Sequence, residues 1–124
     1  RDSLDNGLRV GLATDVAGGS HESMLRAMTH AIQASKLRWR LYDQEVKPLP
    51  FERAFYLATM GGGAFFGNVG SFLDGYEFDA VVLDDASLDH PQELSVRARL
   101  ERAAYLADDR NLTAKFVAGQ KILG

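Results

Sequence analysis

The sequence predicts an α/β fold that finishes in a small β unit. Three observations support this: an apolar β-type segment comes first, at residues 8–14; helical stretches surround a second β-type segment, at residues 78–83; and two short β-type segments meet at Ala118–Gly119 near the end of the chain. A period of two residues indicates strands and a period of 3.6 indicates helices. The expected order is strand, helix, helix, strand, helix, strand, strand.

The first predicted strand, Leu8–Thr14, runs directly into Asp15 and a glycine turn at Gly18–Gly19. Small residues on one face of a strand indicate close packing against a neighbouring element. Here Leu8, Val10 and Leu12 share one face, and the small residues Gly11 and Ala13 share the other.

Two helices are expected next. The first ends at Leu41 and can be capped by Ser20 or Ser23, because a serine hydroxyl accepts from a free backbone N–H of the first turn. Pro50 suits the start of the second, residues 51–60, and Gly61–Gly63 are expected to end it. The apolar residues at helical spacing are Met24, Leu25, Met28, Ile32 and Trp39 in the first helix, and Ala54, Phe55, Leu57 and Ala58 in the second.

The second half of the chain is predicted from the same kinds of signal. After a turn-rich stretch at 64–76, Phe78–Leu83 is expected to be a strand, and Pro91 is expected to open a helix that reaches about Ala107. Asp108–Asn111 then forms a turn. The final strands, Thr113–Val117 and Gln120–Leu123, are joined tightly, as in a hairpin.

Composition restricts the class of protein. With 124 residues, 46% hydrophobic and 25% charged, the chain resembles one ordinary soluble domain. It contains no apolar run long enough to span a bilayer and no visible signal peptide, so we expect no membrane partner. Cysteine is absent, which excludes disulfides and thiolate metal sites and fits a cytoplasmic location.

Charge also argues against one class of partner. The net charge is −3, and the densest basic stretch, at Arg97, Arg99 and Arg102, is interrupted by Glu101. Nucleic-acid binding usually needs a clustered basic patch, so we expect no nucleic-acid partner. The chain begins at Arg1 and reaches an apolar segment almost at once. This suggests a cut piece or a truncated reading frame, although a processed N-terminus would give the same sequence.

Asp15 is the strongest candidate for chemistry. A carboxylate just beyond a buried strand lies at the carboxyl edge of the sheet, which hosts the active site in α/β folds. There it can ligate a metal and take a proton from metal-bound water. Two alternatives stay open. Asp15 could merely cap a helix or turn, and Gly18–Gly19 could bind an anion, although the Lys and Ser/Thr of a phosphate loop are missing.

The histidines, the Asp108–Arg110 stretch and the aromatic residues are expected to have structural roles. His21, His30 and His90 include no pair at the i, i+2 or i, i+4 spacing of a metal site, so we interpret them as surface or partly buried residues, with His21 nearest Asp15 in sequence. A scattered triad stays open. In Asp108–Arg110 we expect a turn and a local ion pair. A core role is expected for the aromatic residues Phe65, Phe66, Phe72, Tyr76 and Phe78.

Several segments together resemble the guanine deaminases of the amidohydrolase superfamily. They are GLATDVAGG (11–19) with SML (23–25), LATMGG (57–62), GNVGSFLDGYEFDAVVLDD (67–85) and RLERAAYLADDRNLTAKFVAGQKI (99–122). The TD-x-x-GG element and the DDRN turn favour guanine deaminases over related chlorohydrolases and adenosine-type deaminases. The resemblance covers nearly the whole chain in order.

The resemblance implies that the chain is the C-terminal part of a (β/α)₈ metal-dependent hydrolase barrel with part of its small β-sandwich domain. Residues 1–66 would supply the last barrel strand and the helices after it. Residues 67–124 would belong to the β domain, with an inserted helix. Asp15 would be both the metal-site and the catalytic aspartate, whereas the other ligands of the family, an early His-x-His pair and two later histidines, and its proton-shuttling glutamate would lie upstream.

The implied reaction is hydrolysis of guanine to xanthine and ammonia. In the intact parent a zinc ion would lower the pKa of bound water to about 7, and Asp15 would orient that water and accept its proton. A barrel needs about 250 residues, so this chain alone is expected to be inactive and to hold no zinc tightly. Alternatives are a related chlorohydrolase or aminohydrolase, and a non-catalytic module that self-associates. We expect a homo-oligomer, most simply a dimer.

Overall fold

The computed structural model describes residues 6–124. The chain divides into two compact units, the first ending at Gly70 and the second running from Ser71 to Gly124. The first unit is helical and the second combines a small sheet with one helix. The chain is therefore of mixed helix and sheet content.

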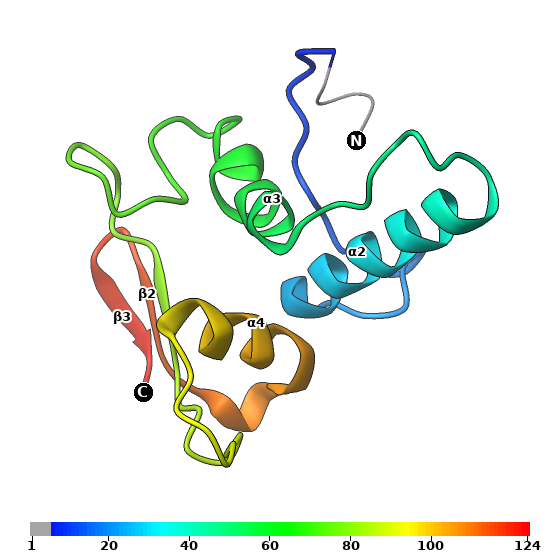
Figure 1. Ribbon diagram of the computed structural model, residues 1–124. Helices are drawn as coiled ribbons and strands as arrows, with labels where there is room; N and C mark the ends of the chain where they lie inside the picture. Colours follow the sequence, from blue (N-terminus) through cyan, green and yellow to red (C-terminus); the bar gives the residue numbers. More distant parts are fainter. Residues whose placement is uncertain (1–5) are drawn as a thin grey trace. The chain divides into compact units, whose positions relative to one another are not determined.

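The first unit is built around two helices that pack together, α2 (Met24–Leu41) and α3 (Phe51–Tyr56) (Figure 1). Ser23 caps α2, because its side chain accepts a hydrogen bond from the Arg26 N–H, so the second of the two predicted caps is correct. Apolar side chains at helical spacing meet between the helices. The buried residues are Met28, Ile32, Leu49, Phe51, Ala54 and Leu57.

The predicted strand at 8–14 is wrong in this structure. The segment is extended and half-buried on alternate residues, Val10, Leu12 and Thr14, but no strand pairs with it among the described residues. Its Leu12 N–H instead donates to the Leu57 carbonyl oxygen at 2.9 Å. A strand exists only when a second strand supplies its ladder of hydrogen bonds, and the neighbour here is a helical segment.

The glycines at 61–63 do not end the second helix. A π-helical turn, η1 (Leu57–Gly61), follows α3, and Gly62 keeps a right-handed φ of −71°. The backbone of residues 10–11 passes very close by: a Cβ on Gly61 would lie 2.8 Å from the Val10 carbonyl oxygen, and one on Gly11 would lie 2.8 Å from the Gly62 Cα. These glycines permit close packing of two backbones, which is a different use from the left-handed cap that the sequence predicted.

The second unit contains a three-stranded antiparallel sheet in the order β1 (Ala80–Leu83), β2 (Leu112–Val117), β3 (Gln120–Leu123). The three predicted strands are confirmed. Ala118 and Gly119 both have positive φ, 48° and 77°, which is the backbone of a tight hairpin turn. Phe116 of β2 contacts Phe78, whose ring centroid lies 5.5 Å away.

The third helix, α4, runs from Val96 to Leu106 and starts later than predicted. Pro91 does not open it. Ser95 does, because its backbone is extended (φ −61°, ψ 157°) and its hydroxyl accepts from the Ala98 N–H at 3.3 Å. Side chains of α4 also hold the preceding loop. Arg99 forms a two-bond ion pair with Asp85, at 2.7 and 2.8 Å, and the Arg102 guanidinium donates to loop carbonyls.

The expectation of an aromatic core at residues 65–78 is wrong. Phe65, Phe66 and Phe72 are 87%, 77% and 75% exposed, and Phe78 is half exposed. These residues lie in turns and irregular stretches, and their ring contacts are Phe65 with Phe66, Phe72 with Phe78, and Phe78 with Phe116. Aromatic rings are buried only where a second layer covers them, and no layer within either unit's described residues does so here.

No helix in the described part of the chain is long and apolar enough to cross a membrane.

Candidate functional site

Asp15 lies where the extended segment 8–14 turns back toward α2. Its own φ is +51° and that of Ala17 is +84°, values that side-chain-bearing residues adopt rarely. The Asp15 carbonyl oxygen accepts hydrogen bonds from the N–H groups of both Gly18, at 2.9 Å, and Gly19. The turn therefore reverses the chain within five residues and leaves Asp15 exposed to solvent.

A hollow of about 380 Å³ lies between the end of this segment and one face of α2. His21 and His30 both line it, and their ring centroids are 6.3 Å apart. Nη1 of Arg26 lies 2.7 Å from Nε2 of His21, and since a guanidinium can only donate, the imidazole accepts. The remaining walls are Leu12, Ala13, Thr14, Gly19, Ser20, Ala27, Ala31 and Ala34.

The described residues do not make a metal site by themselves. A zinc ion in a catalytic site takes at least three protein ligands. Within residues 6–124 no group of three or more His, Cys, Asp or Glu side chains is placed to hold a metal ion. The donor set of the described residues therefore does not fit a bound zinc without ligands from elsewhere.

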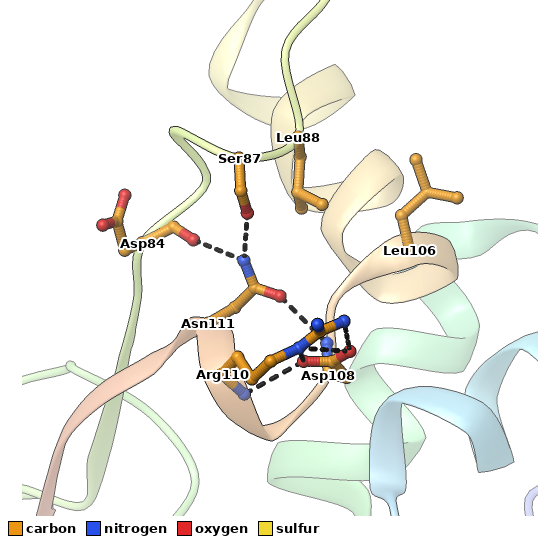
Figure 2. Close-up of a pocket in the computed structure, with 7 residues that line it drawn as sticks. All are labelled: Asp84, Ser87, Leu88, Leu106, Asp108, Arg110 and Asn111. Carbon is orange, nitrogen blue, oxygen red and sulfur yellow. Dashed lines mark hydrogen bonds and ion pairs between the residues drawn. The ribbon is translucent and has the colours of Figure 1, made fainter.

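A second hollow, of about 400 Å³, lies in the second unit beside the turn that joins α4 to β2 (Figure 2). Asn111 is 6% exposed and connects both sides of it. Its Nδ2 donates to the Asp84 carbonyl oxygen at 2.8 Å and to Ser87 Oγ at 3.0 Å, while its Oδ1 accepts from the Asp108 N–H at 3.0 Å. The hydrogen bonds of Asn111 thus join the two sides of this hollow. No buried polar side-chain atom in the described residues lacks a partner.

The polar residues that border this turn are paired locally. Nη2 of Arg110 lies 2.6 Å from Oδ2 of Asp108, and this hydrogen bond raises the pKa of Arg110. Asp108 also caps the short 3₁₀ helix η2 (Asp109–Asn111). The structural interpretation of Asp108–Arg110 is therefore confirmed: these residues build a turn. Near them, the hydrogen bond from Arg99 lowers the pKa of Asp85.

Two features of the structure were not predicted from the sequence. The first is Asn111, although its spacing of three from Asp108 is the signature of a capping box, which is present here. The second is the contact between the Asp15 carboxylate and Gly18: a Cβ on Gly18 would lie 2.8 Å from Oδ2. A glycine pair after an aspartate gives only a weak signal for such a contact.

The chain matches known proteins over nearly its whole length. The model of the Amidohydrolase family matches residues 1–122. Guanine deaminase of Dictyostelium discoideum is 33% identical over 129 residues, covering 98% of this chain and 28% of its own length. Guanine deaminase of Homo sapiens is 33% identical over 131 residues, covering 97% of the chain and 29% of its own length.

Two solved structures also match. A guanine deaminase from C. acetobutylicum, with guanine bound in its active site, superposes with a TM-score of 0.92 at 41% identity, over 98% of this chain and 29% of that one. The E. coli guanine deaminase gives a TM-score of 0.81 at 28% identity, over 98% and 28%. The chain thus spans less than a third of the length of the relatives that it matches.

Proposed function

The chain belongs to the amidohydrolase family, and from that premise we propose that it is the C-terminal part of a guanine-deaminase-like hydrolase that converts guanine and water to xanthine and ammonia. Residues 1–66 would contribute the last strand and following helices of a (β/α)₈ barrel, and residues 67–124 part of a small β domain. The observation that carries the proposal is the match, at 41% identity over 98% of the chain, to a guanine deaminase with guanine in its active site.

Asp15 is the residue that we propose to be catalytic. It stands at the end of an extended segment whose alternate residues are half-buried, as in a strand, and it is exposed at a sharp turn. In the proposed parent the missing strand partners of residues 8–14 would be other barrel strands. Asp15 would then lie at the carboxyl edge of the barrel, where barrel enzymes carry their active sites.

The role proposed for Asp15 is that of a general base. Its carboxylate would orient the attacking water, accept a proton from it and pass that proton toward the leaving ammonia. We also propose Asp15 as one ligand of a metal in the parent. Because the described residues include no cluster of three ligands, we expect the chain alone to be inactive.

The test uses the complete reading frame that encodes this chain, with xanthine formation from guanine followed by absorbance. Asp15→Asn keeps the shape of the side chain but removes the proton acceptor, so kcat should fall by about 10²–10⁴-fold. Asp109→Asn is the control, since this exposed carboxylate lies in the η2 turn. Near-normal turnover in Asp15→Asn would contradict the role proposed for Asp15, and no guanine hydrolysis by the parent would contradict the proposed function.

A second candidate is a non-catalytic module that self-associates. It is favoured by large apolar side chains that the described chain leaves open, above all Phe65, Phe66 and Phe72. Met28 and Ile32 of α2 are not part of this exposed surface: they are 2% and 4% exposed, because α3 packs against α2. Any self-association would therefore use other surfaces.

A further inference from the structure

In the turn at residues 15–19, the Asp15 carboxylate lies beside Gly18. The three heavy atoms nearest to a Cβ built on Gly18 all belong to the Asp15 carboxylate: Oδ2 at 2.8 Å, Cγ at 3.3 Å and Oδ1 at 3.4 Å. A separation below 3.0 Å is shorter than real Cβ atoms tolerate. The carboxylate thus occupies the space that any other residue at position 18 would need.

The backbone conformation does not explain why position 18 is a glycine. The positive φ angles of the turn fall on Asp15 and Ala17, and Gly18 is not among the glycines with positive φ. An alanine at position 18 would therefore suffer no penalty from a left-handed backbone. What it would meet is the carboxylate of Asp15.

We infer that Gly18 is a positioning residue for the Asp15 carboxylate, an inference that rests on the catalytic role proposed for Asp15. The absence of a side chain at position 18 leaves the space in which the carboxylate lies over the turn. A methyl group there would rotate it away. A shift of about 1 Å in a reacting group can cost about 10²-fold in rate, so the orientation matters for a general base.

A side chain added at position 18 would meet different atoms from one added at position 19. A Cβ on Gly19 would strike the Thr14 carbonyl oxygen and lie 2.9 Å from the Asp15 carbonyl oxygen, both of which are backbone atoms. The backbone of a tight turn cannot yield easily. A side-chain carboxylate can rotate about χ1 and χ2. Gly18→Ala should therefore change the orientation of Asp15 while the fold is kept, whereas Gly19→Ala should lower the thermal stability.

The first experiment needs no enzymatic activity. In the isotope-labelled chain, NMR should show a nuclear Overhauser contact between Asp15 Hβ and Gly18 Hα, and Gly18→Ala should shift the Asp15 ¹³Cγ resonance. Gly62→Ala is the matched control, because its φ is right-handed and its Cβ would meet its nearest atom at an ordinary 3.6 Å. An unchanged ¹³Cγ resonance in a folded Gly18→Ala chain would overturn the inference. So would a shift of equal size in Gly62→Ala.

The second experiment measures turnover of guanine by the complete reading frame that encodes the chain. Gly18→Ala should lower kcat by about 10²-fold with little change in KM, because the loss is in orientation of the base and not in binding. If Asp15→Asn retains turnover, the catalytic role proposed for Asp15 fails, and the NMR result still stands by itself. If Asp15→Asn is inactive while Gly18→Ala is fully active, the positioning role is wrong.

Discussion

Replacing Asn111 by alanine should be among the most damaging single changes in the second unit. The side chain is 6% exposed and makes three hydrogen bonds, to the Asp84 carbonyl oxygen, Ser87 Oγ and the Asp108 N–H (Figure 2). Each bond contributes about 0.5–1.5 kcal/mol net. The expected loss in free energy of unfolding is therefore about 3 kcal/mol. A small domain has about 5–15 kcal/mol in total, so this is a large share.

Urea unfolding followed by circular dichroism would measure the loss as a lower midpoint at an unchanged slope. Ser87→Ala removes one of the three bonds and should cost about 1 kcal/mol or less. Asn111→Asp keeps an acceptor for the Asp108 N–H but cannot donate to the Asp84 carbonyl oxygen. Its free energy of unfolding should therefore stay well below that of wild type. An Asn111→Ala chain within about 0.5 kcal/mol of wild type would refute the reasoning, because that is the range of ordinary surface substitutions.

Four further outcomes are expected. Asp85→Asn should be less stable than wild type at neutral pH, and the difference in urea midpoint should shrink on acidification. The hydrogen bond from Arg99 lowers the folded pKa of Asp85 below 3.8, so the stabilisation by the Asp85 carboxylate is present above pH 3.8 and is lost as the pH falls through the folded pKa. A difference in urea midpoint that is constant with pH would contradict this. Met28→Ala, at a site 2% exposed, should cost about 2–5 kcal/mol in urea unfolding, unlike Leu41→Ala at a site 66% exposed; equal losses would contradict this. Metal analysis of the chain purified without chelator should find no stoichiometric zinc, because three ligands are needed; one zinc per chain would oppose this. Light scattering should report a dimer mass, and a monomer mass that is stable on concentration would show otherwise.

Local hydrogen bonding made several parts of this molecule predictable from sequence. Ser23 was one of two expected caps of α2, and the turn at Ala118–Gly119 and the Asp108–Asn111 turn were expected where they occur. Each of these features is built from atoms a few residues apart, so the residues that specify it are visible together. The motif around Asp15 was recognisable for the same reason, since it is one continuous run of residues.

Features that depend on distant partners were decided only by the tertiary structure. Residues 8–14 carry a strand pattern but form no strand, because the neighbour of Leu12 in space is Leu57 of a helical segment. The exposure of Phe65 and Phe72 depends on whether another layer covers them, and the role of Asn111 depends on Asp84, 27 residues away. Sequence by itself determined the local turns, the Ser23 cap and the family. Pairing, burial and the orientation of the Asp15 carboxylate required the folded chain, because each is a contact whose second partner no local pattern identifies.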